Sequence, residues 1–219
     1  MEKSRAERLV SNAEGMDAVV IVNDGDPFLD STFWYLTEQS SGTFEGSFAI
    51  VRSDGSLHVI VSILEEESAN EGKGEVHVFH NREERDGFIK DALRGCRKVG
   101  FNMHSATYAG VQYIRKVAEG IECVDAGKAI GDTVSVKDAK EIEATKRACA
   151  ISSQVAGEIP DMLSEGVSEK EVAARMDNRM RELGGTGNAF DTIAAFGAYS
   201  SQPHHMPCDY RLQKGDTAL

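Results

Sequence analysis

Short apolar runs separated by polar segments dominate the first half of the chain. Residues 18–22 are β-branched or small and apolar at every position, which is typical of a strand covered on both faces. Two further runs, 47–51 and 57–63, flank an Asp-Gly dipeptide at 54–55, and this order predicts a hairpin. The other strand candidates of this half are residues 76–79, 98–101 and 121–124.

Helical patterns lie between these runs. Residues 2–13 have the charge density of a solvent-facing helix, and residues 81–93 gather their apolar side chains on one face. Ser105 is expected to cap a helix that reaches Ala118. Alternating strand and helix signals predict a mixed α/β domain with a largely buried sheet over residues 1–130. Residues 127–136 show no firm periodicity and are interpreted as the approach to a domain boundary.

The second half has a different pattern, with two long amphipathic segments. Asp138 is expected to cap the first, and Pro160 to weaken its last turn, because proline removes a backbone donor. Ser168 and Glu171 have the spacing of a capping box, which predicts the start of the second helix. These helices and the apolar runs after them predict a second domain over residues 131–219.

Composition narrows the function classes. The formal net charge of −12 argues against non-specific nucleic-acid binding, which needs clustered basic residues. No apolar run approaches the length of a membrane span, and the charged N-terminus lacks the apolar segment of a signal peptide. The cysteines lie far apart without CxxC spacing, so buried reduced thiols in the cytoplasm are expected. They are Cys96, Cys123, Cys149 and Cys208.

The C-terminal stretch combines an apolar run with a histidine pair. Residues 190–195 are a strand candidate, and Pro203 is followed directly by His204 and His205. A Gly-Asp turn at 215–216 then opens another apolar run.

The order of these motifs resembles the pita-bread metallopeptidase superfamily of prolidase, Xaa-Pro aminopeptidase, creatinase and methionine aminopeptidase. Residues 30–37 are similar to the family's Asn/Asp-x-x-Tyr-Leu-Thr segment, and 137–142 to the entry of its first catalytic-domain helix. Residues 166–172 resemble the Gly-x-Ser/Thr-Glu-x-Glu entry of its second helix. The resemblance implies an α/β creatinase-like N-terminal domain with a mixed sheet and helices. The first part of an α+β pita-bread catalytic domain is expected to follow it.

The resemblance also selects one histidine. His204 matches the family histidine that lines the substrate pocket and hydrogen-bonds the peptide carbonyl or the tetrahedral intermediate, so it is predicted to be catalytic and substrate-binding. His205 is a weaker substrate-binding candidate, because neighbouring side chains on an extended backbone point to opposite sides. Together with Cys208 and Asp209 the pair lacks a recognised ligand spacing, and no metal ligand is predicted. The remaining histidines are interpreted as ordinary sheet or surface residues: His58, His77, His80 and His104.

The implied chemistry is hydrolysis at two divalent ions, of manganese, cobalt or zinc, held by two Asp, one His and two Glu. In the family the first of these follows a strand like residues 215–219, and none can be assigned here. The chain is therefore expected to be the front part of the enzyme, cut off before the ligands, without metal and inactive by itself.

The implied function is an Xaa-Pro aminopeptidase or dipeptidase that cleaves peptides with proline in the second position and forms a homodimer when complete. Two alternatives stay open at this point. They are a non-catalytic binding protein on the same scaffold and a creatinase-like amidinohydrolase.

Overall fold

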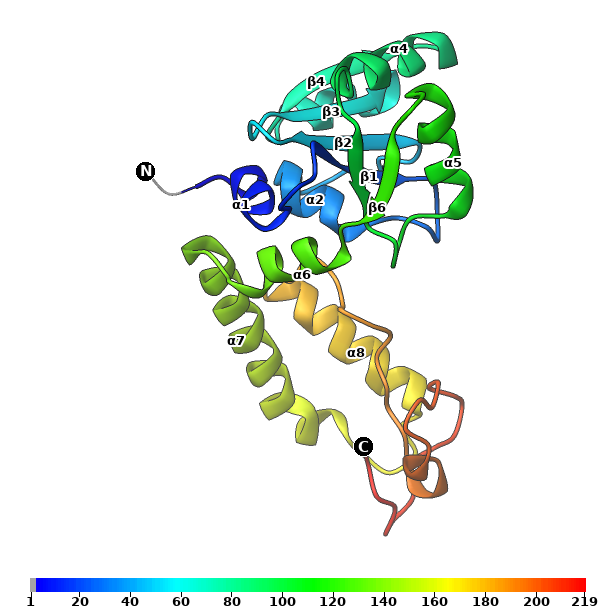
Figure 1. Cartoon of the computed structure of the whole chain (residues 1–219). Coiled ribbons are helices and arrows are strands. Elements are labelled where there is room, and N and C mark those ends of the chain that lie inside the picture. Colours follow the sequence, from blue (N-terminus) through cyan, green and yellow to red (C-terminus); the bar gives the residue numbers. More distant parts are fainter. Residues whose placement is uncertain (1–2) are drawn as a thin grey trace. The chain divides into compact units, whose positions relative to one another are not determined.

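The computed structural model describes residues 3–219 of the chain. The chain divides into two compact units, Met1–Val136 and Lys137–Leu219 (Figure 1). Among residues 3–219, no helix has both the length and the apolar character that crossing a bilayer requires.

A six-stranded mixed sheet forms the centre of the first unit, in the order β4-β3-β2-β1-β5-β6 (Figure 1). Strand β2 runs antiparallel to both of its neighbours, and every other adjacent pair is parallel. The mixed α/β class predicted for this half of the chain is confirmed. The strands are β1 (Ala18–Asn23), β2 (Ser47–Arg52), β3 (Leu57–Ser62), β4 (Glu75–Phe79), β5 (Lys98–Phe101) and β6 (Glu122–Asp125).

Helices cover both faces of this sheet. Alternate residues of β1 enter different apolar clusters: Val19 and Ile21 pack with α1, α2 and α6, while Val20 and Val22 pack with α4 and α5. All six β1 residues are buried, as predicted for a strand covered on two sides. The helices are α1 (Arg5–Asn12), α2 (Ser31–Thr37), α3 (Glu66–Asn70), α4 (Arg82–Ala92), α5 (Tyr108–Val117) and α6 (Gly127–Ser135), with a 3₁₀ turn at Ile63–Glu65.

One expectation for this unit is wrong. Helix α5 is capped by Thr107, whose side chain accepts from the Gly110 amide, and not by Ser105, whose amide closes a turn onto Asn102. Residues 127–136, in which no firm periodicity was apparent, contain α6 and end at the boundary between the two units.

Helix α6 forms because its apolar side is buried. Ala129 and Ile130 join the cluster around α1, and the Asn12 side chain donates to Thr133 at 2.9 Å. The compact unit therefore continues past the boundary expected at residue 130, to Val136. That the N-terminal domain, residues 1 to about 130, folds on its own stays a prediction.

The second unit contains two long helices, α7 (Ala139–Met162) and α8 (Glu169–Glu182), and a 3₁₀ turn at Gly197–Ser201. Asp138 caps α7 and a capping box at Ser168 opens α8, both as predicted, and Asp138 also forms a capping box with Glu141. The Arg179 guanidinium on α8 joins them by donating to both carboxylate oxygens of Glu158, at 2.7 and 3.1 Å. Of the α7 residues Val155 is buried, whereas Cys149, expected to be a buried thiol, is exposed, because α8 covers a narrow face of α7.

The predicted C-terminal strands form only a short pair. Ala195 and Leu219 exchange backbone hydrogen bonds at 2.8 and 2.9 Å, around a single bridge between Phe196 and Ala218. Within the described chain no further strand joins this pair. An isolated two-stranded ladder is only marginally stable, and the pair is accordingly short.

Candidate substrate pocket and the buried Glu169

A hollow of about 560 Å³ opens in the second unit, at the segments that the sequence analysis singled out. Its walls are mostly apolar with a few polar groups, the usual composition of a small-ligand site. The lining residues are Phe190, Asp191, Ile193, Pro203, His204, His205 and Met206.

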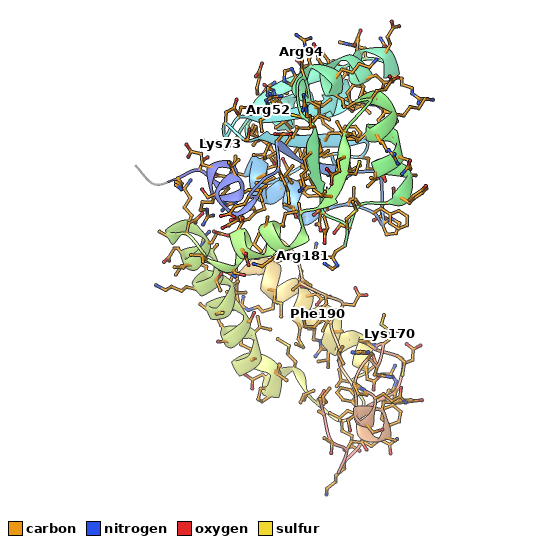
Figure 2. All side chains as sticks on the ribbon, viewed as in Figure 1. Arg52, Lys73, Arg94, Lys170, Arg181 and Phe190 are labelled. Carbon is orange, nitrogen blue, oxygen red and sulfur yellow. The ribbon has the colours of Figure 1, made fainter. Side chains whose placement is uncertain are left out.

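One wall of the hollow is fastened to α8. The Asp177 carboxylate accepts hydrogen bonds from Asn188 at 2.8 Å and from Thr192 at 2.5 Å. Phe190 lies between these two anchors, on the segment beside α8 that Figure 2 shows, and its side chain is 75% exposed. The backbone is thus held in place while the ring stays accessible to a ligand.

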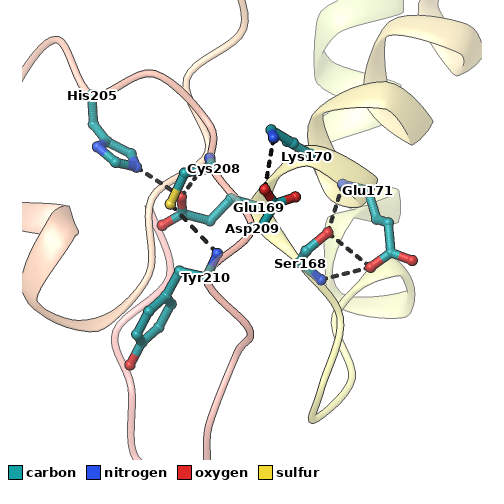
Figure 3. Close-up of polar contacts among 8 residues, drawn as sticks. All are labelled: Ser168, Glu169, Lys170, Glu171, His205, Cys208, Asp209 and Tyr210. Carbon is teal, nitrogen blue, oxygen red and sulfur yellow. Dashed lines mark hydrogen bonds and ion pairs between the residues drawn. The ribbon is translucent and has the colours of Figure 1, made fainter.

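The opposite wall is organised by Glu169, the first residue of α8, which is fully buried. One carboxylate oxygen accepts from the Phe196 amide at 2.8 Å. The other accepts from the Cys208 amide at 2.9 Å and lies 2.7 Å from Nε2 of His205 (Figure 3). A single side chain therefore fixes the segments on both sides of the Pro-His turn.

Glu169 keeps its charge despite its burial. Burial by itself raises the pKa of a carboxyl group, because it disfavours the ionised form. The hydrogen bonds from His205 and from the Cys208 and Phe196 amides outweigh this, and the pKa of Glu169 lies below its usual value of 4.5. An ionised carboxylate is an acceptor only, which matches the three donors around it.

His205 is locked into this network. Its Nε2–H is used by Glu169, and its ring stacks on Tyr199 with centroids 4.7 Å apart. Tyr199 meets Tyr210 edge-on, and the Tyr210 hydroxyl donates to Asp216 at 3.1 Å. The buried imidazole of His205 therefore supports the shape of the turn.

His204 has a different environment from its neighbour. Its side chain is exposed at the hollow and makes no hydrogen bond to any residue between 3 and 219. The expectation of an extended backbone at the pair is wrong, because the His205 amide donates to the Gln202 carbonyl and closes a turn. Both side chains consequently line the same hollow instead of pointing to opposite sides. The substrate role of His204 stays a prediction.

The described residues do not fit a two-metal centre. In this unit one group of potential ligands lies close enough to share an ion, namely Glu169, His205 and Cys208. The Glu169 oxygens already accept three hydrogen bonds, and the set supplies one carboxylate where the implied centre needs four.

Sequence reasoning missed Glu169 and the two tyrosines. Glu169 stands inside a capping box, where a glutamate is normally exposed, so its position gave no sign of burial. The available signal was the motif at residues 166–172, in which Glu169 is the first of the two glutamates.

Comparison with known proteins gives matches over both units. Residues 6–133 match the creatinase/prolidase N-terminal domain, and residues 143–219 match metallopeptidase family M24. A curated Xaa-Pro dipeptidase from Pyrococcus horikoshii is 27% identical over 204 residues, 93% of this chain and 54% of that protein. A second, from Pyrococcus furiosus, is 28% identical over 174 residues, 80% of this chain and 49% of that protein.

Solved structures show the same likeness. The prolidase from Pyrococcus horikoshii superposes with a TM-score of 0.82 at 27% identity, covering 98% of this chain and 58% of that one. An X-Pro aminopeptidase from Thermotoga maritima has a TM-score of 0.83 at 24% identity and covers 98% of this chain and 59% of that one, a likeness of fold. The chain spans about half the length of the curated relatives it matches.

Proposed function

The chain belongs to the creatinase/prolidase and M24 metallopeptidase family, a family of peptidases, and we propose that it is part of an enzyme that cleaves peptides with proline in the second position. The observation that carries this proposal is the likeness to two Xaa-Pro dipeptidases over 80% or more of the chain. The hollow around the histidine pair supports it, because it offers a peptide one free imidazole and a largely apolar wall.

His204 is the residue we assign to substrate. Its exposed imidazole has no protein partner among the described residues, so it is available to donate a hydrogen bond to the peptide carbonyl or to the oxyanion that forms from it. A donor aimed at developing negative charge is typically worth on the order of 10²–10³ in rate. The apolar side chains of Phe190, Ile193 and Met206 offer contact area for a proline ring.

Glu169 and His205 act as positioning residues in this proposal. The carboxylate holds the backbone on both sides of the Pro-His turn, and the buried imidazole fills the space below it against Tyr199. The Glu169 carboxylate and Nε2 of His205 are already engaged with protein partners. Their contribution is the fixed placement of His204.

Divalent metal ions supply an activated water in metallopeptidases. Since the described residues do not assemble a site for two ions, we expect the 219-residue chain alone to lack peptidase activity. In a complete enzyme the ions are expected to be manganese, cobalt or zinc. The homodimer and the cytoplasmic address also remain predictions.

The direct test compares this chain with the complete reading frame on Xaa-Pro and Xaa-Ala dipeptides, with each of the three metals added. We expect hydrolysis of Xaa-Pro in preference to Xaa-Ala by the complete protein, and none by the 219-residue chain. Equal rates on both substrates, or turnover by the short chain, would contradict the proposal.

In the complete enzyme, His204→Ala should lower turnover on the order of 10²-fold while metal content stays unchanged, because the imidazole contacts substrate. His205→Ala should lower turnover less, and His104→Ala, an exposed histidine of the first unit, should leave it unchanged. Loss of metal from His204→Ala, measured by elemental analysis, would show that the residue is a ligand instead.

A second candidate is a non-catalytic protein that binds peptides in the same hollow, because the exposed imidazole and the apolar side chains that line it can hold a peptide by themselves. It predicts that the complete reading frame binds an Xaa-Pro peptide without cleaving it. Creatine, added to the same assay, tests the amidinohydrolase alternative.

A further inference from the structure

Two histidines and a glutamate of the first unit converge at the β4 edge of the sheet. His58 lies on β3, and Glu75 and His77 lie on the edge strand β4. The parallel register sets His58 directly opposite Glu75, and Ile60 opposite His77. Because residues two apart on a strand share a face, all three side chains leave the sheet on the same side.

Their polar atoms form a small triangle. Nδ1 of His58 lies 3.1 Å from Nε2 of His77 and 3.4 Å from a carboxylate oxygen of Glu75, and that Nε2 lies 3.9 Å from the other oxygen. In a tetrahedral zinc site, bonds of about 2.0–2.1 Å put neighbouring ligand atoms roughly 3.3–3.4 Å apart. The triangle matches this spacing with small side-chain adjustments.

The surroundings hold the two imidazoles and leave one side open. Their rings stack with centroids 5.3 Å apart, and the His77 ring packs on Phe88 of α4, also at 5.3 Å. The His58 and His77 side chains are 17% and 21% exposed, against 68% for Glu75. Burial lowers the pKa of His77, which favours the neutral imidazole that a metal requires. Water can reach the remaining coordination positions from the Glu75 side.

We propose that His58, Glu75 and His77 bind one divalent transition-metal ion of the zinc class, which clamps the edge strand β4 to β3. Two imidazoles and a carboxylate suit zinc, cobalt, nickel or copper and do not suit magnesium or calcium, which prefer oxygen ligands. An ion bound here stabilises the folded state, because the unfolded chain does not bring the three residues together.

The competing arrangement is a single hydrogen bond between the imidazoles, one ring donating and the other accepting. Its geometry at 3.1 Å is equally ordinary. The two arrangements differ in zinc binding, so binding decides between them.

The test is a Zn²⁺ titration of the whole 219-residue chain, stripped of metal by chelator, in competition with a chromogenic chelator. We expect one equivalent bound, with affinity lowered at least tenfold in His58→Ala, His77→Ala and Glu75→Gln. Co²⁺ should give the visible absorption of a nitrogen-ligated ion in the wild type. Zinc should also raise the unfolding temperature of the wild type by several degrees, and that of His77→Ala much less.

Two control variants make the result specific. His80→Ala removes an exposed imidazole of a histidine–carboxylate pair with Glu84, 3.1 Å apart, and should bind zinc as the wild type does. Cys208→Ser removes one potential ligand from the group Glu169, His205 and Cys208 of the second unit. It should also bind zinc as the wild type does. Glu75→Gln changes a largely exposed side chain and keeps the fold, so a loss of affinity there is a loss of a ligand. Wild-type affinity in all three site variants, or no zinc bound by the wild type, would overturn the proposal.

Discussion

The two units of the chain are stabilised in different ways. The first buries apolar side chains on both faces of a six-stranded sheet, in two clusters. The second buries a small apolar cluster around Val167, Val172 and Phe196, next to the ionised carboxylate of Glu169. Apolar burial is non-directional and accumulates with area, whereas a buried charge stabilises only when every partner is in place.

The difference between the two units bears on function. The pocket belongs to the unit with the smaller core, where a carboxylate with three donors fixes the backbone around His204. Hydrogen-bond networks specify geometry more sharply than apolar contacts do, because their energy falls steeply with misalignment. Precise placement of the turn that carries His204, the residue we propose to bind substrate, is consistent with that kind of support.

The largest expected effect is a core truncation in the first unit. Phe33→Ala removes a fully buried ring in contact with Trp34 and Phe44, and should cost about 3–5 kcal/mol of unfolding free energy. Urea unfolding followed by the fluorescence of Trp34, the single tryptophan of the chain, measures it. Phe28→Ala, at a ring 55% exposed, is the matched control and should cost little. If Phe33→Ala and Phe28→Ala lose the same unfolding free energy, apolar burial does not account for the stability of the first unit.

Glu169→Ala should destabilise the second unit by about 3 kcal/mol, because it leaves buried donors without an acceptor. The Phe196 and Cys208 amides should lose their protection from hydrogen exchange, while amides of β1 keep theirs. Glu165→Ala, at an exposed position, serves as the control. Unchanged protection of the two amides in Glu169→Ala would mean that apolar packing alone holds the turn.

Acid should weaken the same network to a smaller extent. The folded pKa of Glu169 is below 4.5, so its stabilising effect is complete above that pH and is lost as the pH falls through the folded value. Hydrogen exchange at Phe196 and Cys208, corrected for the intrinsic pH dependence, should therefore accelerate below pH 4.5.

A matched variant assigns this acid response. Glu169→Gln removes the titrating group and should show no step in that range. It also separates Glu169 from Glu158 and Glu171, whose pKa values are lowered by hydrogen bonds from Arg179 and from the Ser168 backbone. A step of the same size in Glu169→Gln would assign the acid response to Glu158 and Glu171.

The smallest expected effect is loss of a helix cap. Ser168→Ala removes the hydroxyl that accepts from the Glu171 amide at 3.2 Å, and should cost about 1 kcal/mol. Ser4→Ala removes the same motif from α1 of the first unit, and Ser164→Ala is the exposed control. Similar losses of unfolding free energy in Ser4→Ala and Ser168→Ala would show that helix capping contributes equally in the two units. The difference in stabilisation between the units would then lie in tertiary burial. Thermal unfolding of the variants gives the comparison.

Local sequence patterns were sufficient to predict a helix, strand or turn wherever its signal lies within a few residues. The β-branched run of β1, the Asp-Gly hairpin between β2 and β3, the Asp138 cap and the capping box at Ser168 all formed as predicted, because strand propensity, turn formation and helix capping depend on neighbours in the chain. Helix α6 was not predicted, because its glycines weaken the apolar periodicity. The helix is stabilised by the packing of Ala129 and Ile130 on the α1 cluster.

The sequence by itself determined the order of the elements, the mixed α/β class of the first unit and the family motifs that lead to His204. The tertiary structure decided which polar groups meet. His58 and His77 looked like unrelated sheet residues until the β3–β4 register brought them to 3.1 Å, and Glu169 looked like a helix-end carboxylate until distant segments enclosed it. The reason is physical: helix and strand signals are short-range and repeat along the chain, whereas the partners of a buried charge or a metal ligand are set by pairing between segments far apart in sequence.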